Sequence, residues 1–212
     1  MPPDPASEFG PIAAAVYPRV AAAMAGDVSG HDLAHVLRVR FLALCWATGQ
    51  DADPALVELI ALLHDVGSAV GRQGHGARGA RLAQEWLLAA GAAPSLARRA
   101  VDAIAALSWS TGHVPEAIEG RLVQDADRLD AIGALGIGRA FAYGGVYGQN
   151  PGLPLPGGSR AAPGTSVAHF ADKLLCLADR LHTPEARRLA QGRHAFLLEF
   201  LRRLQAEADG EL

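Results

Sequence analysis

Apolar residues recur every three or four positions along almost the whole chain, which is the spacing of one face of an α-helix. The pattern is clear in seven segments, residues 32–48, 54–70, 77–90, 94–107, 121–143, 166–181 and 184–204. The sequence shows no sustained alternation of apolar and polar residues, the pattern typical of a half-buried strand. The sequence therefore predicts an all-α fold.

Prolines mark the starts of two of the predicted helices. Asp53-Pro54 and Thr183-Pro184 each place a cap residue before a proline in the first helical turn, where a missing backbone N–H costs least. These positions predict that helices begin at Pro54 and at Pro184.

One long segment interrupts the helical pattern. Residues 144–164 hold seven glycines and four prolines. A loop of this length in a compact domain is usually a lid or a disordered segment. We expect a flexible loop over 144–164 within a single domain that spans residues 1–212, with its core at about 25–205.

Composition supports a packed domain and argues against several classes of partner. Of the 212 residues, 50% are hydrophobic and 19% are charged, which is enough apolar material for a sizeable core. The net charge of −3 gives no basic excess for nucleic acid or an anionic membrane surface, and 6% aromatic residues do not suit a base-stacking platform. We expect no nucleic-acid polymer among the partners.

The sequence also carries expectations about localisation. It has no apolar run of the roughly 18–20 residues that a membrane span requires, and no positive charge precedes the first apolar stretch as in a secretory signal. Cys45 and Cys176 lie far apart in apolar runs without a CxxC pattern, which favours a reducing compartment. We expect a cytoplasmic protein with no membrane partner; the sequence carries no signal of its oligomeric state.

A His-Asp doublet ends the most apolar of the predicted helices. His64-Asp65 directly follows the apolar run 59–63. An imidazole and a carboxylate at the end of a buried helix cost desolvation free energy unless a partner compensates them. A divalent cation is one such partner, because both groups are ordinary metal ligands. For an isolated doublet, however, a helix cap is the better interpretation.

Histidines and acids elsewhere strengthen the metal interpretation. His31, His35 and Arg38 have the spacing that places them on one face of a helix. Further along, 123–130 holds three acids in six positions of an otherwise apolar helix. A solvated face explains one or two of these acids, but not acids on several sides of a buried helix.

Together these motifs resemble the HD-domain metal-dependent phosphohydrolases, in particular small stand-alone bacterial members with a long QDADRLDAIGA motif. The matching segments are 31–35, 63–65, 124–134, 138–141, 169–170 and 173–175, and the resemblance covers roughly residues 25–205. It implies an all-α helical bundle, a single HD domain with the long glycine- and proline-rich loop described above. Carried over residue by residue, it implies that His35, His64, Asp65 and Asp127 are the metal ligands.

A second copy of one motif offers a rival for the fourth ligand. Residues 178–181 repeat the Ala-Asp-Arg-Leu of 126–129 and resemble a motif of guanosine tetraphosphate hydrolases. We favour Asp127 over Asp179, because the whole segment around Asp127 matches the family and Asp179 stands alone. We expect Asp179 to cap a helix or to pair with an arginine.

Other motifs carry weaker interpretations. His31-Asp32-x-x-His35 approximates a zinc-protease HExxH, but it has Asp for Glu and leaves the doublet at 64–65 unexplained. Residues 74–79 satisfy GxGxxG literally, yet no strand precedes them, so a dinucleotide site fails its structural test. His75, in the same turn, is either a site residue, as the resemblance implies, or a solvated loop residue. The family often has a histidine where this chain has Leu107, which removes any proton transfer by that group.

The resemblance implies hydrolysis of phosphate esters or anhydrides, with nucleotides as the expected substrates. We expect one divalent ion, Mn²⁺ first, with Fe²⁺, Co²⁺, Ni²⁺, Mg²⁺ and Zn²⁺ as alternatives. Asp65, His75 and Lys173 are the expected catalytic residues. The expected substrate-binding residues are His31, Arg38, Arg128, His169 and Lys173.

Lys173 is the single lysine beside 18 arginines, which favours a specific use for its compact charge. Spaced four apart, His169 and Lys173 are predicted to form a phosphate clamp on one helix face; a surface helix with a snorkelling lysine is the alternative. Two further functions stay open. One is a phosphodiesterase or guanosine tetraphosphate hydrolase that uses the same metal site, and the other is a regulatory module that binds metal without turnover.

Overall fold

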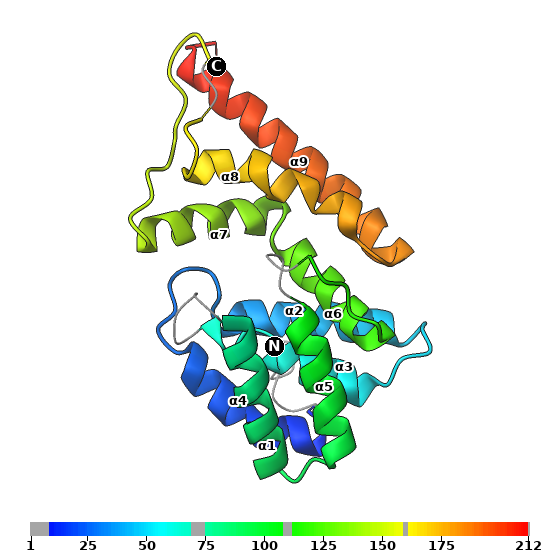
Figure 1. The fold of residues 1–212 in the computed structure, drawn as a ribbon. Helices are drawn as coiled ribbons and strands as arrows, with labels where there is room; N and C mark the ends of the chain where they lie inside the picture. Colours follow the sequence, from blue (N-terminus) through cyan, green and yellow to red (C-terminus); the bar gives the residue numbers. More distant parts are fainter. Residues whose placement is uncertain (1–8, 69–74, 108–111, 159–160, 212) are drawn as a thin grey trace, which may run out of the picture. The chain divides into compact units, whose positions relative to one another are not determined.

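The computed structural model describes residues 9–68, 75–107, 112–158 and 161–211, without the side chain of His75. The described residues form helices, turns and loops but no strand, so the all-α prediction is confirmed (Figure 1). The helices are α1 (Pro11–Met24), α2 (Leu33–Ala47), α3 (Pro54–Leu63), α4 (His75–Ala89), α5 (Pro94–Ala106), α6 (Ile118–Asp130), α7 (Gly133–Val146), α8 (Ser166–Asp172) and α9 (Pro184–Ala208). No helix in the described part of the chain is long and apolar enough to cross a membrane.

The chain divides into two compact units. Unit 1 comprises Met1–Asp27 and His31–Ala126, and unit 2 comprises Val28–Gly30 and Asp127–Leu212. The division falls within α6, so that one continuous helix begins in unit 1 and ends in unit 2. The prediction of a single domain over residues 1–212 stays a prediction.

Helix α3 is the centre of unit 1. Every residue from Leu56 to Leu63 is buried, and α1, α2 and α5 pack against this helix. Asp53 caps its start by accepting hydrogen bonds from two backbone N–H groups, with Pro54 as the first helical residue, as the sequence predicts. Helices α4 and α5 lie side by side in the same unit (Figure 1). The most apolar helix is thus packed on several sides, and the His-Asp doublet follows directly after its last residue.

Helix α1 has no counterpart among the predicted helices. Pro18 lies in its interior, where it removes one helical hydrogen bond and hides the helical pattern. Four residues spaced three or four apart nevertheless face the core of unit 1, namely Ala13, Val16, Val20 and Met24. Burial of this face offsets the helix defect at the proline.

Unit 2 is built around three aromatic rings on α7, α8 and α9. Phe170 stacks on Phe200 with ring centroids 5.6 Å apart, and Phe141 lies 6.1 and 6.2 Å from the two rings. Thr183 caps α9 by accepting a hydrogen bond from the Ala186 N–H, so this helix begins at Pro184 as predicted.

Three predicted helices are shorter than expected. The segment 54–70 stops being helical after Leu63, before the His-Asp doublet. The segment 121–143 breaks at Gly133, whose φ of +75° belongs to the left-handed region that glycine tolerates. The segment 166–181 breaks at Lys173, with φ −140° and ψ −58°, and continues as two short 3-10 turns, Leu174–Cys176 and Ala178–Arg180.

The long loop begins later than predicted, because α7 continues to Val146. Where described, this loop contacts the last turns of α9. The Gly157 N–H donates to Asp209 at 2.8 Å, and the Gln205 side-chain amide donates to the Leu155 carbonyl at 3.3 Å. The expected flexibility of 144–164 stays a prediction.

Candidate metal centre

His64 is held in a defined orientation at the end of α3. It follows the last residue of the helix, and its Nδ1 lies 2.8 Å from the carbonyl oxygen of Ala61. A carbonyl only accepts, so Nδ1 carries the proton and donates it, which leaves the Nε2 lone pair free for another partner. A hydrogen bond at one ring nitrogen is how proteins orient a metal-ligating histidine.

His35 brings a second ring nitrogen to the same place from α2. Asp32 caps that helix by accepting a hydrogen bond from the His35 N–H at 2.8 Å, and the His35 ring is fully buried. Nε2 of His35 lies 3.2 Å from Nε2 of His64, and the ring planes meet at 71°. The two imidazoles therefore point the same kind of donor atom toward one spot.

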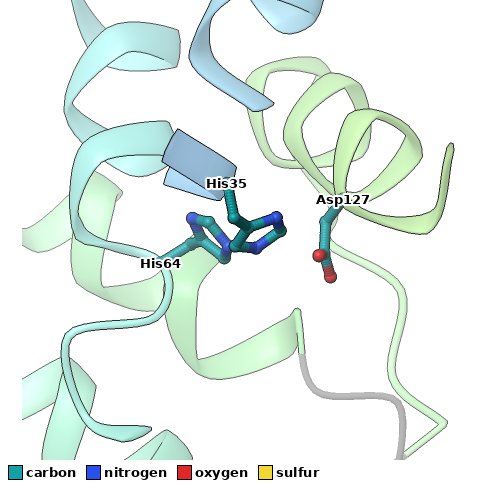
Figure 2. A group of neighbouring side chains, drawn as sticks. All are labelled: His35, His64 and Asp127. Atoms are coloured by element: carbon teal, nitrogen blue, oxygen red, sulfur yellow. The ribbon is translucent and has the colours of Figure 1, made fainter. Parts of the chain in front are cut away.

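Asp127 adds a carboxylate from α6. The helix is buried from Leu122 to Asp130 except at Asp127, which is half-buried. One ligand atom from each of His35, His64 and Asp127 lies within 4.8 Å of the others (Figure 2). Asp127 directly follows the last unit 1 residue on the same helix.

The donor set fits a divalent ion. Two nitrogens that bind one ion at about 2.0–2.1 Å are roughly 2.9–3.4 Å apart at tetrahedral to octahedral angles, and the observed separation is 3.2 Å. Oδ2 of Asp65 is buried and has no hydrogen-bond partner among the described residues. A buried carboxylate oxygen without a partner is costly, and a cation is the group that compensates it best.

Two other predicted site residues, Asp65 and His75, and the rival ligand Asp179 lie outside this group or outside the described side chains. Asp65 follows His64 directly but does not belong to the three-residue group. Asp179 is exposed in a 3-10 turn and is also outside this group. His75 is the first residue of α4, and its side chain lies outside the described residues.

The predicted substrate-binding residues of unit 1 lie beside His35. The spacing of His31 predicts a position within the helix. In the structure, however, His31 precedes Asp32, the cap of α2. Its ring still meets the His35 ring edge-on, with centroids 5.9 Å apart. Arg38 lies on α2 one turn after His35 and is half-buried.

Arg128 is engaged within unit 2. It is buried, its Nη1 donates to the Arg180 carbonyl, and the same atom lies 3.2 Å from His182 Nε2. His182 had no predicted role, and the sequence gives no signal for this contact. A substrate role for Arg128 stays a prediction.

His169 and Lys173 do not share a helix in the predicted way. His169 lies in the last turn of α8, whereas Lys173 follows the last helical residue with a non-helical backbone. The Lys173 N–H still donates to the His169 carbonyl at 3.0 Å. The two residues are adjacent along a helix end, and their joint role as a phosphate clamp stays a prediction.

Two residues of the matched motifs make structural contacts that the sequence analysis did not assign. The buried Gln124 amide lies 3.2–3.3 Å from three backbone carbonyls, those of Ala106, Leu107 and His113. Arg139 pairs with the buried Asp130 at 3.0 Å. The one sequence signal for these two residues was their position within the segments that match the family.

Comparison with known proteins tests this interpretation of the site. The model of the HD domain family matches residues 32–132, which include the two histidines and Asp127. YpgQ of Bacillus subtilis is 38% identical over 188 residues, which is 87% of either chain. The chain belongs to the HD domain family.

Solved structures of similar proteins agree with this assignment. A Lactobacillus plantarum protein has a TM-score of 0.79 and 32% identity, over 92% of this chain and 96% of its own. YpgQ in complex with ADP has a TM-score of 0.72 and 34% identity, over 92% and 94%. An HD-superfamily hydrolase of Bacillus thuringiensis has a TM-score of 0.68 and 32% identity, over 91% and 94%. The protein is therefore an HD-superfamily hydrolase.

Proposed function

We propose that the protein hydrolyses phosphate esters or anhydrides of nucleotides and uses one divalent ion held by His35, His64, Asp65 and Asp127. The observation that carries the proposal is the convergence of two imidazole nitrogens and a carboxylate within 4.8 Å. Neutral imidazole together with carboxylate suits Mn²⁺, Fe²⁺, Co²⁺ and Ni²⁺ about as well as Zn²⁺. Mn²⁺ is the ion to test first.

A divalent ion in this position would lower the pKa of a bound water and polarise a phosphoryl oxygen. The protein residues prepare the site for it. The hydrogen bond from His64 Nδ1 to the Ala61 carbonyl fixes which ring nitrogen faces the ion. The burial of His35 excludes bulk water on one side, which strengthens electrostatic interactions with the phosphate.

Charged residues that the family resemblance assigns to the site would bind the phosphate chain. Arg38 follows His35 by one turn of α2, and Lys173 follows His169 at the end of α8. A lysine ammonium can serve several phosphate oxygens as a movable point charge. YpgQ has been crystallised with ADP, and its 34% identity over most of both chains supports a nucleotide as the substrate.

The test is a substrate panel on metal-stripped protein that is then supplied with Mn²⁺. The panel contains nucleoside mono-, di- and triphosphates, a cyclic phosphodiester and guanosine tetraphosphate, and it separates release of phosphate from release of pyrophosphate. We expect turnover of at least one nucleotide that requires Mn²⁺.

A pair of histidine variants makes the assay specific. His64→Ala should abolish both metal binding and turnover, whereas His113→Ala removes an exposed histidine outside the three-residue group and should leave both intact. Metal binding without turnover of any panel member would contradict the proposal and favour a regulatory module. Turnover confined to the phosphodiester or to guanosine tetraphosphate would replace the proposed substrate class.

A further inference from the structure

The turn that follows α3 carries Asp65 and is closed by hydrogen bonds of its own. The Asp65 carbonyl oxygen accepts two bonds from Ser68, one from the backbone N–H at 3.0 Å and one from the hydroxyl at 2.5 Å. The two residues between them, Val66 and Gly67, are buried. Two bonds on one carbonyl leave the backbone at Asp65 little freedom.

Helix α4 packs directly on this turn, and both belong to unit 1. Nε of Arg78 donates to the Gly67 carbonyl at 3.2 Å. The next residue, Gly79, is buried, and a Cβ added there would lie 3.3 Å from the Gly67 nitrogen and 3.5 Å from its Cα. A Cβ so close to backbone atoms is crowded, so the glycine lets α4 approach the turn. Arg78 and Gly79 thus hold the turn from the side of α4.

The side chain of Asp65 depends on this support. Its Oδ2 is buried and has no hydrogen-bond partner in the described part of the chain. Metal-ligating carboxylates are usually oriented by hydrogen bonds from neighbouring groups. His64 has such a bond, from Nδ1 to the Ala61 carbonyl. Because the aspartate side chain is short, the position of its oxygens follows the position of its backbone, which the turn sets.

We propose that Arg78 is a positioning residue for the metal ligand Asp65. Its hydrogen bond to the Gly67 carbonyl, together with the close packing of Gly79, holds the turn so that the Asp65 carboxylate faces the ion that His64 binds. This inference rests on the proposed metal binding. The other use of an arginine at such a site is to bind substrate phosphate, and that role would leave metal affinity in the absence of substrate unchanged.

Calorimetric titration of metal-stripped protein with Mn²⁺, without substrate, tests this role. Arg78→Met keeps the apolar stem and removes the donor, and it should weaken Mn²⁺ binding about tenfold, as the loss of a residue that supports a metal ligand typically does. Arg78→Lys keeps a charged donor and should restore part of the affinity. The matched control is Arg81→Met, which changes an exposed arginine one turn further along α4 and should bind Mn²⁺ as the wild type does.

Two variants separate positioning from stability. Gly79→Ala crowds the Gly67 backbone but raises the helix propensity of α4, so Mn²⁺ binding should weaken while the melting temperature stays close to that of the wild type. This variant also tests the inference if Arg78→Met does not fold. Leu87→Ala opens a cavity at a fully buried position of the same helix and should lower the melting temperature while the affinity for Mn²⁺ is unchanged.

A double variant shows whether Arg78 acts through Asp65. Asp65→Ala removes the ligand that Arg78 is proposed to position, so Arg78→Met added to it should weaken binding no further. The wild type, both single variants and the double variant are titrated with Zn²⁺, which such ligands bind more tightly than Mn²⁺, so that weak binding stays measurable. If Arg78→Met weakens binding equally with and without Asp65, Arg78 does not act through this ligand and the inference is wrong.

The outcomes distinguish this inference from the proposed function. If the wild-type protein binds Mn²⁺ and both Arg78→Met and Gly79→Ala bind it with wild-type affinity, the inference is wrong. The same holds if Arg81→Met or Leu87→Ala weakens binding as much as they do, because loss of charge or of stability then explains the effect. If the wild-type protein binds no divalent metal, the proposed function itself fails, and the inference fails with it.

Discussion

The same four residues, Ala-Asp-Arg-Leu, occur at 126–129 and at 178–181, and the two copies fold differently. The first copy lies within α6, where its aspartate faces two histidine rings. The second copy forms a 3-10 turn and its end, with an exposed aspartate. The tetrapeptide by itself therefore specifies neither the local structure nor the chemistry; its surroundings do.

The surroundings differ in two ways. The first copy follows Leu122–Asp125, all buried, so the helix is held on several sides before it reaches Asp127. The second copy follows the break in the helix at Lys173 and a first 3-10 turn. The copies also contact each other, because Arg128 of the first donates to the carbonyl of Arg180 in the second. The second copy thus supports the first rather than duplicating it.

The aspartates should show the largest contrast. Asp127→Ala removes a predicted metal ligand, and a bound metal supplies several kcal/mol to the transition state, so kcat/KM should fall about 10³-fold or more. Asp179→Ala should leave kcat/KM within about twofold of wild type. Parallel kinetics at saturating Mn²⁺ check this, and the reverse ranking would move the site to the second copy.

The leucines should show no contrast. Leu129 and Leu181 are both buried, at 0% and 2% exposure, although one lies in a helix and the other follows a 3-10 turn. Each change to alanine should lower the free energy of unfolding by about 2–5 kcal/mol. Denaturant unfolding of the metal-free variants measures this, and a loss below 1 kcal/mol at either position would contradict the packing described here.

The arginines should differ in stability. Arg128→Met breaks a buried contact with the Arg180 carbonyl and should cost about 1–3 kcal/mol. Arg180→Met changes an exposed side chain and keeps the carbonyl, so it should cost less than about 1 kcal/mol. Thermal unfolding of both variants at one protein concentration gives the comparison. Equal losses would show that the Arg128 contact does not stabilise unit 2.

Lys173 tests whether the region before the second copy takes part in catalysis at all. Lys173→Ala should raise KM or lower kcat about tenfold while the metal content stays at the wild-type level, because a phosphate-binding charge is lost and the predicted ligands remain. Lys173→Arg should restore part of the loss, since a planar fork replaces a compact charge imperfectly. Wild-type kinetics in Lys173→Ala would leave phosphate binding to Arg38 and Arg128.

The sequence predicted what depends on local patterns. The all-α class, the starts at Pro54 and Pro184 and the doublet at the end of a buried helix all follow from periodicity and capping within a few residues. Helix α1 was not predicted, because Pro18 disfavours a helix locally. Burial of the apolar face nevertheless stabilises this helix.

What the sequence could not predict depends on contacts between distant residues. The backbone breaks at Gly133 and Lys173 interrupt apolar patterns that continue across them. Arg139 lies against the backbone of Gly30, more than one hundred positions away along the chain, and this contact leaves no local signal. Among the site residues, the sequence predicted that His35 and Asp127 lie on helices. The 3.2 Å separation of the His35 and His64 Nε2 atoms depends instead on how distant segments pack.

The central claim is that one divalent ion binds where His35, His64 and Asp127 converge. Anomalous diffraction from crystals of the wild-type protein grown with Mn²⁺ tests it most directly. The account predicts one strong peak per chain, within about 2.0–2.5 Å of Nε2 of both histidines and of a carboxylate oxygen of Asp127. A peak beside Asp179 instead, or none near the two histidines in protein that binds Mn²⁺ in solution, would contradict it.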